Sequence, residues 1–302
     1  MTVQSPTTPL QIPPQLLRGA EPVATSRPTA GDGEACGDGI ECEPIDGPTT
    51  LFAQGEGDEH AIDINDINQR GFNDCYLMAA IASLASTDEG RQQLQGMIQP
   101  NDDGTYTVTF RRYDEGGWFG IGSGWEDVKV TVSGDFPSQA SALSGDTNAQ
   151  GEQEIWPQVL EKAYAQYIGG YSEFDADHNG DGKADGGNPG TALEAFTGRD
   201  VETRDPSDYA IEDLNADFQA GQPITLLSPG GDKNGELQGE DGQVADDYGL
   251  HGFHTYAVMD VDVDSGMVTL YNPWGLELEE PIQVPWSEVK DFFIEASTVS
   301  LD

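Results

Sequence analysis

Periodic patterns of apolar positions begin only after the first 58 residues. Up to that point the chain is rich in Pro, Thr, Gly and acidic residues, a composition that buries too little apolar surface to fold by itself. From Ile62 onward, helix-like and strand-like patterns alternate. We therefore predict a disordered leader or propeptide over residues 1–58, followed by a folded region.

Five segments have the pattern of helices. "CYLMAAIASLAS" predicts a buried helix that begins near Cys75, and "EIWPQVLEKAYAQYIGGY" predicts an amphipathic helix that ends at Gly169 and Gly170. "TALEAFTG" and "SDYAIEDLNADFQAG" predict two shorter helices that each end at a glycine, and "WSEVKDFFIEA" predicts a helix near the end of the chain. The two apolar rows of the amphipathic helix are Ile155, Val159, Ala163 and Tyr167, and Trp156, Leu160, Tyr164 and Ile168.

Alternating apolar and polar positions predict strands in both parts of the folded region. "TYTVTFRRY" and "EDVKVTV" flank the loop "DEGGWFGIGSGW", and "PITLLSP", "HTYAVMDVDV" and "MVTLYNPW" follow later. A tight "DSG" turn joins the last two of these strands. The chain therefore predicts an α+β fold, with a mainly helical half over residues 59–221 and a β-rich half over residues 222–302.

The charge balance narrows the choice of partners. The 302-residue chain has 55 acidic and 13 basic residues, for a formal net charge of −42. Such a field repels phosphate backbones and anionic lipids, so we expect no nucleic-acid binding and no binding to membrane surfaces. It suits cations or a salty environment, and solubility alone would also explain it.

Nothing in the sequence predicts membrane insertion or a conventional signal peptide. No stretch reaches the roughly 18 apolar residues that a membrane-spanning helix needs, and the first residues lack a basic patch and a long apolar segment. Two localisations fit the sequence, which are export by another route and the cytoplasm. Cys36 and Cys42 could pair in an oxidising compartment, which would leave Cys75 as the odd thiol.

Cys75 is a candidate nucleophile because of its place in the predicted helix. A cysteine beside apolar residues is most often a packing residue. Asn73 or Asp74 can cap this helix, however, so that Cys75 lies in its first turn. There the helix dipole favours the thiolate, which is the reactive form of a thiol.

Three further residues complete a catalytic pattern around Cys75. His254 opens a predicted strand, and Asn272 ends the neighbouring strand, so antiparallel pairing would place them side by side. An Asn carbonyl there can orient the imidazole, as in a Cys-His-Asn triad. The Gln69 amide, together with the backbone N–H of Cys75, can bind a developing oxyanion. Each residue alone has an ordinary structural explanation, but the order Gln, Cys, His, Asn favours catalysis.

These segments resemble the calpain family of cysteine proteases over about residues 60–300. The matches are Q-x5-C followed by an aromatic residue and "LMAAIASLAS", the "EIWPQVLEKAYAQYIGGY" helix, H-x-Y-x-V and "NPWG". The resemblance implies a papain-like fold with Cys75 as nucleophile, His254 as general base and acid, Asn272 as orienting residue and Gln69 as oxyanion donor. It also implies that Trp274 lies at the substrate cleft.

The chain departs from the family pattern at several positions. Arg70 and Asn73 stand where the family usually has glycines, and Tyr76 stands where it usually has tryptophan. Arg70 beside the oxyanion site could alter substrate preference. The chain ends with the protease core, so we expect a core-only, prokaryotic member without the family's C-terminal β-sandwich and EF-hand domains.

An acidic segment has the spacing of a calcium-binding loop. "DADHNGDGKAD", residues 175–185, has oxygen ligands at alternate positions and a glycine at the sixth place. Gly186 stands where a bidentate glutamate is expected, although Asp185 could substitute for it. The alternative is an ordinary Asp-Gly-rich surface turn. The expected ligands are Asp175, Asp177, Asn179, Asp181 and Asp185.

Taken together, these observations predict a calcium-dependent cysteine endopeptidase. The resemblance independently implies dependence on Ca²⁺, and no organic cofactor is expected. The enzyme would cleave protein or peptide substrates through a thioester on Cys75 and could also remove its own leader. The acidic run over residues 230–252 would be either a mobile gate over the cleft or a solvated insertion. The alternative functions are a papain-like transglutaminase or deamidase, and a non-catalytic calcium-binding protein with the same fold.

Overall fold

The computed structural model describes residues 36, 40–55, 58–116, 123–137, 142, 147–177, 186–231, 236–276 and 278–301. The chain divides into a unit of residues 1–32 and a unit of residues 33–302, and every described residue lies in the second unit. Within the described ranges, no helix is both long enough and apolar enough to cross a bilayer. Buried apolar side chains form two clusters, one mainly from residues 36–201 and one from residues 209–296.

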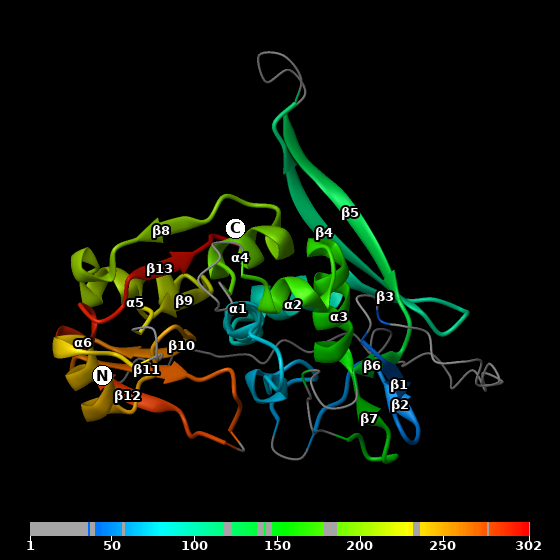
Figure 1. Cartoon of the computed structure of the whole chain (residues 1–302), viewed down its shortest axis with the longest axis horizontal. Coiled ribbons are helices and arrows are strands. Elements are labelled where there is room, and N and C mark those ends of the chain that lie inside the picture. Colours follow the sequence, from blue (N-terminus) through cyan, green and yellow to red (C-terminus); the bar gives the residue numbers. More distant parts are fainter. Residues whose placement is uncertain are drawn as a thin grey trace, which may run out of the picture. The chain divides into compact units, whose positions relative to one another are not determined.

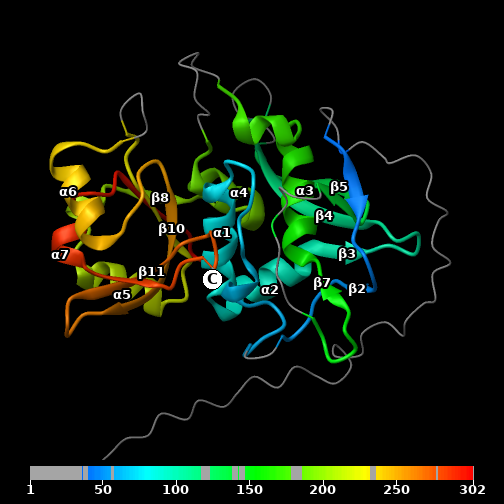
Figure 2. The same ribbon diagram turned by 60° about the horizontal axis from the view of Figure 1, so that its bottom comes forward.

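The central helix of the first cluster is α1 (Cys75–Ala85), which is buried from Tyr76 to its last residue. Its alanines let neighbouring elements approach closely, so α1 packs against helices on one side and strands β9 and β10 on the other (Figures 1 and 2). The elements that accompany it are η1 (Ile64–Asp66), α2 (Asp88–Met97), β3 (Ile98–Pro100), β4 (Tyr106–Asp114), β5 (Gly124–Val132), α3 (Trp156–Ile168), η3 (Tyr171–Asp175) and α4 (Pro189–Thr197).

Strands β3, β4 and β5 form a three-stranded antiparallel sheet. Val108 faces Val130 and Phe110 faces Val128, so the apolar positions of the two long strands share one face, as their alternation predicts. Val108 and Phe110 are fully buried, and Phe110 packs edge-on against Tyr164 of α3. The sheet therefore covers the helical cluster with its apolar face.

Helix α3 ends at Gly169 as expected, where the backbone has φ +125°. The expectation of an amphipathic helix is wrong for its first ten residues, because Gln158, Glu161 and Lys162 are buried as well. Residues that precede α3 in the chain cover the polar side chains of this helix. Lys162 Nζ donates to the Asp135 carbonyl at 2.7 Å, and Glu161 accepts the Ala142 N–H. Buried polar groups need such partners, so the covering segment and the helix depend on each other.

The second cluster lies on a six-stranded antiparallel sheet with the order β12-β11-β10-β9-β13-β8. Strands β10 and β11 are the predicted hairpin, and their register pairs Ala257 with Tyr271. The elements of this part are β8 (Glu202–Arg204), η4 (Pro206–Asp208), α5 (Ile211–Gln219), β9 (Ile224–Leu227), α6 (Gly239–Tyr248), β10 (Thr255–Asp262), β11 (Met267–Tyr271), β12 (Ile282–Pro285), α7 (Trp286–Val289) and β13 (Glu295–Thr298).

Two segments of this part differ from the sequence-based expectation. The last predicted helix stops at Val289, and β13 follows it, because pairing with β9 and β8 on both sides satisfies its backbone. The acidic run over residues 230–252 contains helix α6. Glu240 and Asp241 lie in the first turn of α6 and favour its N-terminus, and Gly249 ends it in the left-handed region.

The predicted leader contains structured residues. Cys36 and Cys42 form a disulfide with a Cα–Cα distance of 5.5 Å. Strand β1 (Cys42–Pro44) pairs with β6 (Asp135–Pro137), and β2 (Thr49–Thr50) pairs with β7 (Gln153–Glu154). Strand pairing with residues about 90 positions later cannot be seen in local composition, so the leader boundary at residue 58 lies too late.

A steric contact beside α1 gives a test of this packing. A Cβ added at Gly187 would lie 2.2 Å from the ring of Tyr76, which is itself buried against Tyr164 and Phe174. We expect Gly187→Ala to lower the free energy of unfolding by about 1–3 kcal/mol. Thermal melts followed by circular dichroism measure the change.

The control is Gly96→Ala at an exposed position of α2, where an added Cβ meets nothing within 4 Å. This variant should gain up to about 1 kcal/mol from helix propensity. Equal melting temperatures for the two variants would contradict the packing of Gly187 on Tyr76.

Candidate active site

The N-terminus of α1 places Cys75 against strand β10. The Asp74 carbonyl accepts the N–H groups of Leu77 and Met78 at 2.9 and 3.0 Å, so Cys75 is the first residue of the helix. The Cys75 thiol lies close enough to Thr255, the first residue of β10, for Thr255 to lower the pKa of the thiol. His254 immediately precedes Thr255, so the sequence-predicted nucleophile and base lie at the meeting point of these two elements.

His254 and Asn272 lie at adjacent strand ends, as the predicted hairpin requires. His254 Nε2 is 2.8 Å from Asn272 Oδ1, and both side chains are buried. The Trp274 N–H also donates to Asn272 Oδ1 at 3.1 Å, and its indole lies 4.9 Å from the His254 ring, measured between centroids. Because Asn272 Oδ1 can only accept, Nε2 of the neutral imidazole carries the proton and Nδ1 holds the free lone pair.

Burial sets the protonation states of both groups. It raises the pKa of the Cys75 thiol to about 11, and the nearby Asp74 carboxylate adds to this effect. Burial lowers the pKa of His254 to about 4, although the hydrogen bond to Asn272 opposes it. At neutral pH the pair is therefore a thiol and a neutral imidazole. The expectation that the helix dipole favours a thiolate is wrong for this conformation, because desolvation is the larger effect.

Gln69 lies in the same region but has its amide engaged. Its Nε2 donates to the Phe72 carbonyl at 2.8 Å, and its side chain lies close enough to Asp74 to lower the pKa of that carboxyl group. The Gln69 backbone N–H donates to the Pro273 carbonyl at 2.7 Å. This bond links the loop before Cys75 to the loop that carries Asn272 and Trp274. The structure thus brings the four predicted catalytic residues together.

Sequence reasoning missed several residues around this site. Asp74 is buried beside Cys75, and burial raises its pKa to about 7. Glu279 accepts a hydrogen bond from Asn272 Nδ2. His251, which the sequence placed in a mobile loop, packs against Trp274 with 4.4 Å between ring centroids. Asp74 could have been found from its place beside the candidate nucleophile, whereas the other two depend on the fold of their loops.

The predicted calcium ligands are only partly described. Asp175 Oδ1 accepts hydrogen bonds from the backbone N–H and the Nδ2 of Asn73, at 3.3 and 2.6 Å. Asp177 follows it, while Asn179, Asp181 and Asp185 lie outside the described residues. Across the part of the chain that the structure describes, no three His, Cys, Asp or Glu side chains are grouped to hold a metal ion. The described oxygen donors suit Ca²⁺ by their chemistry, but they do not make a complete site.

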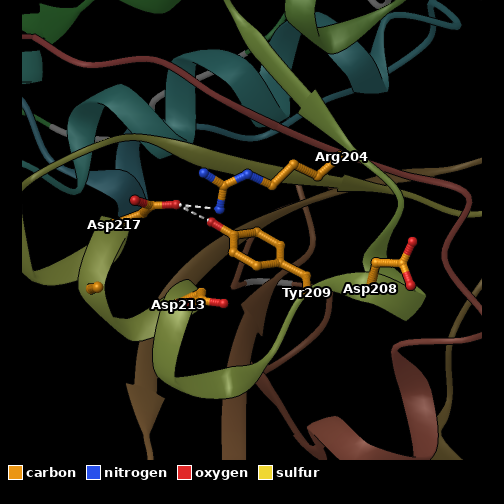
Figure 3. A pocket seen from close by; sticks show the side chains of 6 residues that line it. Arg204, Asp208, Tyr209, Asp213 and Asp217 are labelled. Atoms are coloured by element: carbon orange, nitrogen blue, oxygen red, sulfur yellow. Dashed lines mark hydrogen bonds and ion pairs between the residues drawn. The ribbon is translucent and has the colours of Figure 1, made fainter.

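A cavity of about 370 Å³ lies away from the predicted site residues, between β8 and α5 (Figure 3). Asp217 accepts hydrogen bonds from both Arg204, at 2.9 Å, and the Tyr209 hydroxyl. The guanidinium lies over the Tyr209 ring at 4.6 Å. These groups satisfy one another, and no predicted site residue lines the cavity.

Fold and site together define a papain-like cysteine protease core. The model of the calpain family cysteine proteases matches residues 51–293, so the chain belongs to the calpain family. It is 26% identical to the calpain-type cysteine protease DEK1 of Zea mays over 82% of this chain and 10% of that protein. It is 28% identical to the calpain-1 catalytic subunit of Bos taurus over 76% of this chain and 30% of that protein. The chain thus spans a third or less of these relatives.

The protonation state of Cys75 predicts its reactivity. A thiol with a pKa of about 11 has a thiolate fraction at pH 7 that is about two orders of magnitude below that of an ordinary cysteine. Without added calcium, iodoacetamide should therefore alkylate Cys75 about 100-fold more slowly at pH 7 than it alkylates the same residue in the urea-unfolded chain. Intact-mass spectrometry gives both rates, since Cys36 and Cys42 are paired. Equal rates would show that burial does not raise the pKa of the Cys75 thiol.

The raised pKa of Asp74 predicts that the free energy of unfolding depends on pH. Its folded pKa of about 7 lies above its ordinary value of 3.8, so the folded state binds this proton more tightly than the unfolded state. The associated stability is complete below the unfolded pKa and is lost as the pH rises through 7. Asp74→Asn should therefore melt at a higher temperature than the wild type at pH 8, with a smaller difference at pH 5.

Each kcal/mol corresponds to roughly 2–4 °C for a domain of this size. Asp102→Asn, at an exposed position, is the matched control and should show no such pH-dependent difference. A difference for Asp74→Asn that is constant from pH 5 to pH 8 would contradict the raised pKa.

Proposed function

We propose that this chain is a calcium-dependent cysteine endopeptidase with Cys75, His254 and Asn272 as its catalytic triad. The observation that carries the proposal is the buried 2.8 Å contact between His254 Nε2 and Asn272 Oδ1, at the start of the strand that touches the only free thiol. Family membership supports the reaction class.

The geometry assigns a role to each nitrogen of His254. Asn272 holds Nε2–H, so Nδ1 takes the proton from the Cys75 thiol as sulfur attacks the scissile carbonyl. The tetrahedral oxyanion accepts hydrogen bonds from the Cys75 N–H and the Gln69 amide. Collapse expels the amine, which takes the proton from His254, and leaves a thioester on Cys75. His254 then deprotonates water, which attacks the thioester and releases the acid.

The Gln69 amide must change partners for this reaction. Its Nε2 donates to the Phe72 carbonyl, and its side chain lies close enough to Asp74 to lower the pKa of that carboxyl group, so the amide must turn from these neighbours when substrate enters. Together with the neutral thiol and imidazole, this supports the proposal that the described conformation is a resting one. Activation then requires a movement of the loop before Cys75.

Calcium dependence is the part of the proposal that rests on the calpain resemblance. The described residues do not form a complete site, so no reaction step is assigned to the ion. The hydrogen bonds from Asn73 to Asp175 connect the acidic segment to the loop that ends at Cys75. They give the segment of residues 175–185 a direct contact with the nucleophile loop.

The remaining parts of the proposal concern domains and partners. We assign residues 59–221 and 222–302 to the two halves of the core. The two apolar clusters support a division into two halves, although residues 209–221 pack with the second cluster. The substrates would be extended polypeptides, and the N-terminal leader would be one of them. The net charge of −42 argues against nucleic acid as a partner.

Hydrolysis of an unfolded protein across a calcium titration tests the proposal. We expect cleavage that rises with calcium and that falls by at least about 10³-fold in Cys75→Ala, since the thioester cannot form. Amine incorporation without hydrolysis would indicate a transglutaminase instead. Activity that is equal with calcium and with chelator would keep the triad and remove the dependence.

The acidic segment is tested in the same assay. Asp175→Asn/Asp177→Asn should shift the calcium titration to higher concentration. Asp246→Asn/Asp247→Asn removes two exposed charges of α6 and serves as the matched control. Identical titrations for the two double variants would contradict a role for residues 175–185.

A further inference from the structure

A turn after Asn272 brings the Glu279 carboxylate beside Asn272, on the side away from His254. Gly275 N–H donates to the Asn272 carbonyl at 3.0 Å, and the N–H groups of Leu278 and Glu279 both donate to the Gly275 carbonyl at 3.0 Å. Gly275 has φ +91°, and a Cβ there would lie 1.9 Å from Asn68 Oδ1, so only glycine fits this turn. The folded turn places Glu279, seven residues after Asn272, within hydrogen-bond reach of it.

Glu279 connects two side chains of the site. One carboxylate oxygen, Oε2, accepts a hydrogen bond from Asn272 Nδ2. The other, Oε1, lies 3.5 Å from His251 Nε2. Three-quarters of the Glu279 side chain is removed from solvent, since 25% of it is exposed. The hydrogen bonds therefore run from His254 through Asn272 to Glu279, and His251 lies 3.5 Å from the second carboxylate oxygen.

The carboxylate decides which end of the Asn272 amide faces His254. A carboxylate only accepts hydrogen bonds, so it must face Nδ2, and Oδ1 is left to face His254 Nε2. If the amide were reversed, Nδ2 would point at Nε2 and favour the tautomer with its proton on Nδ1. That tautomer cannot accept the thiol proton. The Trp274 N–H, at 3.1 Å from Oδ1, supports the same orientation.

The Glu279 carboxylate also affects the electrostatic interaction between His251 and His254. The His251 and His254 rings lie edge to face with 6.0 Å between centroids, and charge on His251 lowers the pKa of His254. Glu279 lies on the far side of Asn272 from His254 and beside His251, so its negative charge opposes that effect. Besides the Cys75 thiol, Tyr256 is a titratable group beside His254; its ring lies 5.0 Å away, and its pKa is raised, chiefly by burial.

We propose that Glu279 is a positioning residue for the triad, which fixes the Asn272 amide and stabilises the charged form of His254 during catalysis. The proposal rests on the proposed endopeptidase function and adds a fourth side chain to it. Glu279 touches neither substrate nor thiol in this arrangement. It acts through Asn272, and its second oxygen is held by His251.

Glu279→Gln is the main test, because it keeps the shape and removes the charge. We expect kcat to fall about tenfold with KM nearly unchanged, in the range found when hydrogen-bond partners behind active-site ligands are removed. A negative charge favours the imidazolium, so its loss lowers the pKa of His254. The acid limb of the kcat/KM profile, where the imidazole gains a proton, should therefore move to lower pH.

Two further variants accompany it. Glu279→Ala also frees the Asn272 amide and should lower kcat more than Glu279→Gln does. Glu280→Gln removes the same charge from the neighbouring exposed residue and should leave both kcat and the acid limb at their wild-type values. All assays are run at saturating calcium, and circular dichroism melts accompany each variant.

The outcomes separate the two proposals. Cys75-dependent hydrolysis with an unshifted acid limb in Glu279→Gln would overturn the role of Glu279 alone. A lower melting temperature with an unshifted limb would do the same, since it indicates a structural role only. A wild-type chain whose hydrolysis does not depend on Cys75 would overturn the triad and this inference with it.

Discussion

Two buried hydrogen bonds between distant parts of the chain hold the site together. The Tyr271 hydroxyl donates to the Ile67 carbonyl at 2.7 Å, and the Gln69 N–H donates to the Pro273 carbonyl at 2.7 Å. The first joins residues 204 positions apart. Since a buried backbone group without a partner costs about as much as a lost hydrogen bond, these contacts are strongly favoured. They fix the loop before Cys75 to the end of the hairpin that carries His254 and Asn272.

This attachment explains why so few local features are needed to build the site. Once the loop is fixed, the N-terminus of α1 meets the start of β10, and Cys75 contacts Thr255. The hairpin of β10 and β11 then places Asn272 beside His254. The rest of the catalytic core supports this junction, with α2, α4 and the β4–β5 sheet packed around α1 or against its neighbours.

The sequence predicted the parts of this arrangement that depend on local pattern. The hairpin brings His254 and Asn272 together because a short turn joins two adjacent strands, and Gly169 ends α3 because few other residues adopt its backbone conformation. Strand β13 could not be predicted, since its pairing with β9 and β8 is non-local. The same holds for the pairing of Cys42–Pro44 with Asp135–Pro137.

The protonation state of the site shows the same division between local and non-local effects. The helix N-terminus at Cys75 is visible in the sequence, and its dipole favours a thiolate by up to about 2 kcal/mol. Burial depends on the whole fold, and it is large enough to reverse that preference and to keep His254 neutral. A charged thiolate–imidazolium pair therefore needs compensation from outside the two residues.

The residues around His254 and Asn272 show where that compensation can arise. Trp274 and Tyr256 exclude water from His254, which strengthens its hydrogen bond to Asn272 and also penalises its charged form. A carboxylate in direct contact with His254 would compensate this penalty, but it would add a negative charge close to the thiolate. In the proposed arrangement, Glu279 acts through the uncharged Asn272 amide instead. An Asn in the third position of the proposed triad would thus allow the orienting group and the compensating charge to be separate residues.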